Sequence, residues 1–315
     1  MKKSKVLIIM MVALLVFTGC TAKGVAKKDQ VFISYVKLPL NVPSIVEKKE
    51  ELFEKAFGEK DIEVSFSEIT QGSKMTQAMA AGALDFSNAL GGTSAILAGA
   101  NGLDIKIIGI YSRAPEAFTI MSGDTNIKGT SDLKGKKIVG PKGTILHQLL
   151  LSALVNEGLS MDDVEFINMG ISEGLAAMSS GNADAALVAG PAVTKAMKEG
   201  NKVIINGKGL LDATIVIATS GDMVNNHEEI VKTYLNVHNE SLDFMKNNPE
   251  KTYEMVSEET GISVDEVKSM YQWYDFSPAI TDKDIEELEK TQKFLLENGM
   301  LEKEIDIKSI IAEIK

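Results

Sequence analysis

Cysteine is almost absent from this 315-residue chain, in which Cys20 is the only one. A disulfide within the chain is therefore excluded. Histidine is scarce too, with three residues, and none forms a metal-spaced pair with a glutamate. The chain also lacks a Gly-x-Ser-x-Gly elbow and a Walker loop, the usual settings for a nucleophilic serine and for a nucleotide phosphate. These absences argue against an enzyme and predict neither a metal nor a cofactor.

Basic segments are missing as well. The formal net charge is −11, and no basic stripe or aromatic-rich basic segment occurs. Nucleic acid is therefore not an expected partner. The hydrophobic content of 44% and the charged content of 24% are ordinary for a globular protein. The length favours two domains over one.

The N-terminus has the pattern of an export signal. Three lysines within the first five residues precede an uninterrupted apolar run at 6–17. That run is shorter than the about 20 residues that span a bilayer. It ends at Cys20, which predicts a lipoprotein signal at 1–19 and a lipid anchor and tether at 20–30. The alternative is an ordinary cleaved signal with an unrelated cysteine. Lipidation also explains why an exported chain has an unpaired cysteine.

One segment occurs twice. Residues 78–91 read AMAAGALDFSNALG and residues 177–190 read AMSSGNADAALVAG, with five identities at an offset of 99. Strand-like runs precede and follow both copies. A period this long is unlike that of a solenoid and predicts two similar α/β lobes. Asp85 and Asp184 occupy the same place in the two copies, and we interpret them as turn or strand-start residues rather than as an acid–base pair.

Strand-like and helix-like segments alternate up to about residue 220, and only helix-like segments follow. Short loops between them predict largely parallel sheets flanked by helices. We expect the first lobe at 31–112 plus 220–315 and the second at 113–219, with crossings near 112–119 and 213–219. The helical C-terminal part should pack on the first lobe. Trp273 and the fifteen methionines are interpreted as core residues.

Two predicted loops enter helices through small residues at the carboxyl ends of strands, where open α/β sheets bind ligands. Helix N-termini attract anions, glycine lets a ligand approach the backbone, and a threonine hydroxyl can donate a hydrogen bond. Arg113 could hold an anion or form a surface ion pair, and His147 could face the cleft or the lobe interior. The candidate ligand residues are Leu38, Asn41, Gly91, Gly92, Thr93, Ser112, Arg113, Lys142, Gly143, Thr144, His147, Gly190 and Pro191.

Several motifs together resemble the substrate-binding proteins of ABC importers, in the group that serves aliphatic sulfonates, taurine, nitrate and thiamine-pyrimidine precursors. Besides the leader and the duplication, they are GGTSAILA, DLKGKKI, PKGT, GLSMDDVEF and SSGNADAALVAGPA, and the match covers residues 31–220. The resemblance implies a type II periplasmic-binding-protein-like fold. In that fold two crossover strands join the lobes, and the ligand lies between them.

The resemblance also implies a function. We expect a monomer, lipid-anchored on the extracytoplasmic face of the cell membrane, that captures a small organic anion such as a sulfonate or taurine and delivers it to the permease subunits. A pyrimidine or thiamine precursor, nitrate or bicarbonate remain alternative ligands, and a role beside a membrane sensor remains an alternative to import. The related pyrimidine-precursor synthases carry a cysteine-rich motif that this chain lacks.

Overall fold

The computed structural model of the chain describes residues 28–37 and 39–314. The expected signal segment, Cys20, most of the expected tether and Leu38 lie outside the described residues. No helix among the described residues is both long and apolar enough to cross a membrane.

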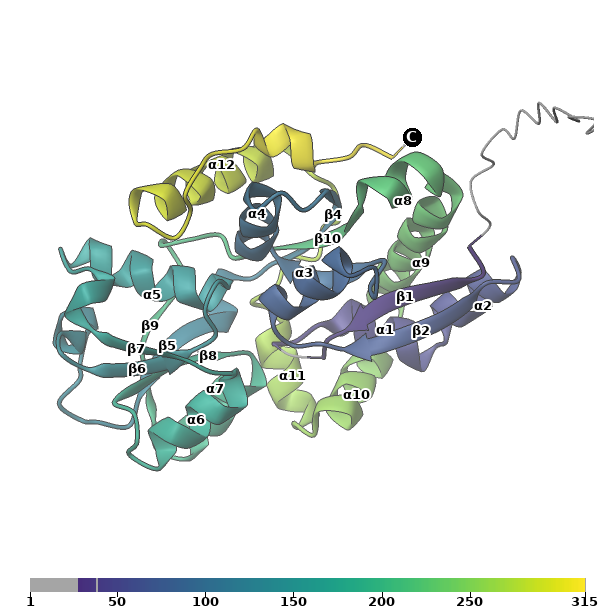
Figure 1. Cartoon of the computed structure of the whole chain (residues 1–315). Helices are drawn as coiled ribbons and strands as arrows, with labels where there is room; N and C mark the ends of the chain where they lie inside the picture. Colours follow the sequence, from purple (N-terminus) through teal and green to yellow (C-terminus); the bar gives the residue numbers. More distant parts are fainter. Residues whose placement is uncertain (1–27, 38, 315) are drawn as a thin grey trace, which may run out of the picture.

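The described chain forms two α/β lobes, which lie side by side in Figure 1. The sheet of the second lobe has the strand order β7-β6-β8-β5-β9. In it β6 runs parallel to β7 and β8, whereas β5 runs antiparallel to β8 and β9. The five strands are β5 (Phe118–Ser122), β6 (Lys137–Gly140), β7 (Glu165–Asn168), β8 (Ala185–Ala189) and β9 (Lys202–Asn206).

The first lobe repeats this arrangement. One sheet is a parallel pair, β1-β2, and the other has the antiparallel order β3-β10-β4; a bridge between Ile33 and Phe86 connects the two. Taken together, the strands of the first lobe have the order β2-β1-β3-β10-β4. This matches the order β7-β6-β8-β5-β9 of the second lobe, with β10 in the place of β5. The strands are β1 (Gln30–Tyr35), β2 (Glu63–Glu68), β3 (Ser87–Gly91), β4 (Ile105–Arg113) and β10 (Thr214–Ser220). The predicted two-lobed fold with mixed sheets is confirmed, and only the crossing strands β5 and β10 oppose their neighbours.

The duplicated segment folds into the same unit in both lobes. Helix α3 (Gly72–Ala80) and helix α6 (Ile171–Ser179) are offset by the 99 residues seen in the sequence. The next helices, α4 (Gly92–Ala100) and α7 (Pro191–Lys198), also correspond. Asp85 accepts a hydrogen bond from Phe32 N at 2.9 Å, and Asp184 accepts one from Lys137 N at 2.7 Å. Each aspartate thus ties its segment to a neighbouring strand, which confirms the interpretation as a structural residue.

The first helical segment is divided. The sequence predicts one helix here, capped by Ser44 and running to about Phe57, because Ile45, Leu52 and Phe53 form an apolar stripe. Helix α1 (Val42–Lys49) and helix α2 (Leu52–Gly58) are separate. Glu51 between them has a φ of 52°, in the left-handed region that a continuous right-handed helix excludes. The expectation of one helix is therefore wrong.

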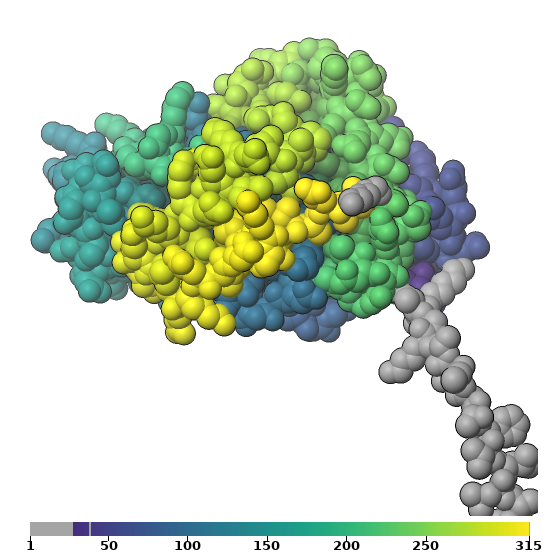
Figure 2. Space-filling view, turned by 90° about the horizontal axis from the view of Figure 1, so that it is seen from above, coloured from purple at the N-terminus to yellow at the C-terminus, as the bar shows by residue number. Residues whose placement is uncertain are grey.

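The C-terminal helices pack on the first lobe, as predicted. They are α8 (Gly221–Asn226), α9 (Glu228–Asn247), α10 (Pro249–Thr260), α11 (Val264–Tyr271) and α12 (Asp282–Glu297). On α9, Tyr234 stacks on Phe86 with ring centroids 4.2 Å apart, and His238 Nδ1 lies 2.8 Å from Glu47 Oε1 of α1. Figure 2 shows the yellow C-terminal part covering one face of the molecule and reaching the teal second lobe. Trp273 is half-buried against the core, in line with its interpretation.

In the second lobe, helix α5 (Ile145–Asn156) supplies six residues of the buried core, namely Ile145, Leu146, Leu149, Leu150, Ala153 and Leu154. Short 3₁₀ turns complete the described secondary structure at Pro115–Ala117, Thr130–Leu133, Met161–Asp163 and Ile307–Ile310.

Candidate functional site

A cavity of about 80 Å³ lies between the lobes. Both lobes and both crossing segments contribute to its wall. The lining residues are Val36, Pro39, Asn41, Thr70, Gly72, Met75, Ala89, Gly91, Ser94, Phe118, Pro141, Thr144, Ile145, Leu146, Ile171 and Ile215. This volume is well below the about 300–1,000 Å³ of pockets for drug-sized ligands. The cavity in this closed arrangement fits a molecule of only a few heavy atoms.

Five helices begin at the cavity. Its wall contains the N-cap residues of α1, α4 and α5, which are Asn41, Gly91 and Thr144, and the first residues of α3 and α6, which are Gly72 and Ile171. The first backbone N–H groups of a helix have no partner within the helix and carry a partial positive charge. In α3, α4, α5 and α6 no N-cap side chain accepts from these groups. The cavity therefore concentrates N–H donors and positive potential from both lobes.

The remaining wall is neutral. No lysine, arginine, histidine, aspartate or glutamate is found among the described residues that line the cavity. The polar side chains are those of Asn41, Thr70, Ser94 and Thr144. Apolar surface comes mainly from Met75, Phe118, Ile145, Leu146, Ile171 and Ile215. An anion with a single charge and a small apolar group matches this wall.

Ala89 lies in the wall with a φ of 62°. A non-glycine residue in this region is strained by roughly 1–3 kcal/mol, and such strain concentrates at functional sites. Ala89 lies within β3, which α4 follows directly, so the strained position belongs to the part of the cavity where the helix begins.

The lobes touch each other next to the cavity. Ser94 Oγ of the first lobe donates to Gly143 O of the second at 2.8 Å. Thr93 Oγ1 donates to Gln148 Oε1 at 2.5 Å, and Gln148 Nε2 donates to Thr291 Oγ1 of α12 at 3.3 Å. These contacts hold the two lobes together on the α4–α5 side.

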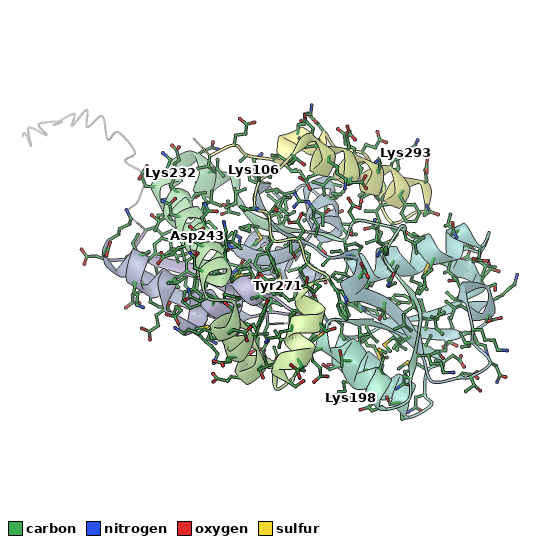
Figure 3. All side chains as sticks on the ribbon, turned by 180° about the vertical axis from the view of Figure 1, so that it is seen from behind. Lys106, Lys198, Lys232, Asp243, Tyr271 and Lys293 are labelled. Atoms are coloured by element: carbon green, nitrogen blue, oxygen red, sulfur yellow. The ribbon has the colours of Figure 1, made fainter. Side chains whose placement is uncertain are left out.

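A second row of contacts follows α7. At its start the backbone of Gly190 packs so tightly on Pro39 that a Cβ added to Gly190 would lie 2.0 Å from Pro39 O. At its end Lys198 forms a 2.8 Å ion pair with Glu266 of α11. Figure 3 labels Lys198 on α7 and Tyr271 at the end of α11. With contacts on both the α4–α5 side and the α7 side, the two lobes are in a closed arrangement.

Three of the candidate ligand residues line the cavity, namely Asn41, Gly91 and Thr144. Gly92 and Thr93 lie on the other side of the α4 N-terminus, against Leu288 and Gln148. Pro191 lines a separate surface hollow between α6, α7 and the α10–α11 loop. Ser112 is fully buried within β4.

The basic candidates point elsewhere. Arg113 forms two hydrogen bonds with the Asp284 carboxylate, at 2.6 and 2.7 Å, and a further ion pair with Asp275. Lys142 and Gly143 line a hollow outside the cavity. His147 lies in the lobe interior, stacks on Phe166 and accepts from Gly143 N at 3.2 Å; burial, followed by the charge of Lys142, lowers its pKa to about 4. Arg113 and His147 support the lobes, Lys142 is exposed, and none of the three places a formal charge in the cavity.

Sequence reasoning missed Thr70, Gly72, Ser94, Phe118 and Ile171. Gly72 and Ile171 start α3 and α6, the helices of the repeat itself. Their alignment at an offset of 99 residues was the available signal, because equivalent helices in two facing lobes direct their N-termini at one cleft. No cluster of three or more His, Cys, Asp or Glu suited to a metal occurs in the described part of the chain.

A known family and several known proteins are similar to this chain. The family model described as NMT1/THI5 like matches residues 53–252. A Bacillus subtilis protein named as aliphatic sulfonates-binding is 28% identical over 323 residues, covering 99% of this chain and 95% of its own length. The taurine-binding periplasmic protein of Escherichia coli is 28% identical over 178 residues, 54% of each chain.

Solved structures share the fold. The alkanesulfonate-binding protein SsuA from Xanthomonas axonopodis pv. citri, bound to MOPS, has a TM-score of 0.83 at 21% identity, covering 91% of this chain and 99% of that one. The periplasmic aliphatic sulphonate binding protein SsuA of Escherichia coli has a TM-score of 0.77 at 22% identity, covering 92% and 94%. The predicted resemblance to the binding-protein fold is confirmed.

Proposed function

The chain belongs to the NMT1/THI5-like family, and we propose that it is the extracytoplasmic solute-binding component of an ABC importer for a small sulfonate. The observation that carries this proposal is the meeting of five helix N-termini in a cavity whose described wall has no charged side chain. The names of its relatives, which refer to aliphatic sulfonates and taurine, point to the same ligand class.

A sulfonate suits these N-termini for a physical reason. Its single negative charge is spread over three oxygens, so donors arriving from several directions can each reach one. A helix N-terminus stabilises an anion by about 0.3–1 kcal/mol at a surface and up to about 2 kcal/mol when partly buried. Four of these ends, those of α3 to α6, have first N–H groups that no cap side chain occupies, and together they supply several kcal/mol without a lysine or arginine. In α1, Pro43 has no N–H and Ser44 N already donates to Tyr111 Oη. A monoanion held by neutral donors can also be released again to the permease.

The ligand that we favour is an alkanesulfonate rather than taurine. Taurine adds an ammonium group, which needs an acceptor once it is removed from water. The described wall offers no carboxylate and presents Phe118, Ile145 and Ile215 instead. A short alkyl group matches these side chains, whereas an ammonium would remain unpaired among them.

In the proposed cycle, ligand enters between open lobes and bridges them, which favours the closed form. The permease subunits then recognise the closed pair of lobes. We further propose that Cys20 carries the lipid that keeps the protein at the outer side of the membrane, since one cysteine follows an export-like segment. The chain acts as a monomer and catalyses no reaction in this scheme.

A thermal-shift screen tests the proposal. The panel contains ethanesulfonate, taurine, nitrate, bicarbonate, acetate and a hydroxymethylpyrimidine. Ligand at 100 times its Kd adds about 2.7 kcal/mol to the free energy of unfolding, which raises Tm by several degrees. We expect the largest shift with ethanesulfonate. If only the pyrimidine raises Tm, the proposed transport role stands and the anion site is refuted. If no sulfonate raises Tm, the proposed ligand class is refuted.

A further inference from the structure

Two hollows outside the cavity join into one groove, which we call the outer groove. The first, of about 650 Å³, lies beside α3 and α4, and the second, of about 370 Å³, lies beside α5 and β7. Leu97, Gly143 and Met300 line both of them. The outer groove therefore passes from the first lobe to the second across the loop that carries Gly143.

Only a thin partition separates the outer groove from the cavity. Ser94 lines both spaces, and its Oγ donates to Gly143 O at 2.8 Å. Gly143 faces the groove, while the adjacent Thr144 faces the cavity. Gly143 has a φ of +71°, and a Cβ there would lie 3.6 Å from Leu97 Cδ1. The partition at this point consists of one hydrogen bond between the lobes, and Gly143 adds no side chain to it.

The groove wall next to this partition contains apolar, adaptable side chains, with Lys142 and Asn298 beside them. Leu97, Met161, Phe166 and Met300 contribute hydrocarbon and thioether surface. Methionine side chains are flexible and fit irregular apolar partners. His147 also lines this hollow, but it stacks on Phe166 at a centroid distance of 4.6 Å and is buried, so it contributes little surface to the groove. This surface could cover a hydrocarbon chain that enters through the partition.

The cavity alone, at about 80 Å³, has room for a head group and little more. We propose that the outer groove is a tail subsite: the sulfonate head stays in the cavity, the chain passes between Ser94 and Gly143, and the tail lies over Leu97 and Met300. The inference rests on the proposed function and extends its substrate class to longer alkanesulfonates. Ligand length is then limited by the groove and not by the cavity.

Isothermal titration of the purified protein with ethanesulfonate and with octanesulfonate tests the subsite. The wild type should bind both, one molecule per chain. Leu97→Gln and Met300→Gln keep side-chain size but place an amide on the proposed tail surface. Each should raise the Kd for octanesulfonate about tenfold and leave the Kd for ethanesulfonate within twofold. Met197→Gln is the matched control, because Met197 is 56% exposed on α7 outside the groove, and it should change neither value.

The outcomes separate the two proposals. If ethanesulfonate binds but octanesulfonate does not, or if the groove variants affect both ligands alike or neither, the tail subsite is refuted and the proposed function stands. If neither sulfonate binds, both the tail subsite and the proposed function are refuted. Melting temperatures of the ligand-free variants close to that of the wild type confirm that the comparison is made on folded protein.

Discussion

Gly190 allows the most direct test of lobe closure. It is the N-cap residue of α7 in the second lobe, directly after β8, and its backbone lies against the Pro39 carbonyl of the first. A Cβ at Gly190 would lie 2.0 Å from Pro39 O, 2.4 Å from Pro39 C and 2.7 Å from Pro39 Cα. All three atoms belong to the backbone, which cannot rotate away as a side chain would. Gly190→Ala should therefore keep the lobes apart.

The magnitude follows from the geometry. Ordinary van der Waals contact begins at 3.4 Å, so the two backbones must separate by about 1.4 Å. Overpacking of this kind costs about 1–3 kcal/mol. Because opening the lobes relieves the clash, that cost falls on the closed, ligand-binding form. The Kd for ethanesulfonate should rise by about 5- to 150-fold.

The assay combines calorimetric titration with small-angle X-ray scattering. Gly190→Ala saturated with ligand should have a larger radius of gyration than saturated wild type. Gly190 has a φ of +56°, which adds strain to an alanine, so Gly209→Ala is the control: its φ is +78°, and a Cβ there meets nothing within 4 Å. The control should lose stability but keep its affinity. Wild-type affinity and compactness in Gly190→Ala would refute the reasoning.

Three further predictions concern side chains outside the cavity. Arg113→Met removes the cationic partner of the Asp284 carboxylate, which is 3% exposed. In a denaturant titration the free energy of unfolding should fall by about 3 kcal/mol, and the ligand Kd should not change. Lys198→Gln and Glu266→Gln each remove the ion pair between α7 and α11, and each should raise ligand Kd by no more than about fivefold, an effect that vanishes in 1 M salt. Because the pKa of His147 is lowered to about 4, the unfolded state binds a proton between pH 6.5 and pH 4 and the folded state does not. The free energy of unfolding should therefore fall by about 2 kcal/mol from pH 7 to pH 5, and the His147→Gln variant should not show this pH dependence.

Each of these has a result that contradicts it. If Arg113→Met weakened ligand binding, the Arg113 guanidinium would have to contribute to the ligand site, contrary to the prediction. Glu266 caps α11 through Oε2, which accepts from Ser263, while Oε1 faces Lys198, so glutamine retains the cap. A large drop in Tm for Glu266→Gln would show that the substitution disrupts the α11 cap rather than only the ion pair with Lys198. A flat wild-type stability profile between pH 7 and pH 5 would contradict the buried, neutral His147.

The duplication made much of the fold predictable. Helices α3 and α6 start and end at positions 99 residues apart, as the sequence repeat does, and Asp85 and Asp184 make the same backbone hydrogen bond in the two lobes. A repeated structural unit needs the same apolar face and the same turn, and those constraints remain visible in the sequence.

The site was less predictable because side-chain direction depends on tertiary packing. Lys142 and Thr144 are two residues apart in one loop, yet only Thr144 faces the cavity, while Lys142 faces the outer groove. Arg113 lies at the crossing as expected, but Asp284, 171 residues later, binds its guanidinium. The break at Glu51 also has no local signal, since neither glycine nor proline marks it.

The measurement that tests the central claim most directly compares ethanesulfonate with ethyl methyl sulfone by calorimetric titration. The two are close in shape, and the sulfone replaces one charged oxygen with a methyl group. If the helix N-termini of α3 to α6 supply the affinity, the sulfonate binds and the sulfone binds at least 100-fold more weakly, a difference of about 2.7 kcal/mol. Equal affinity for both, or binding of the sulfone alone, would contradict an anion site made of helix N-termini.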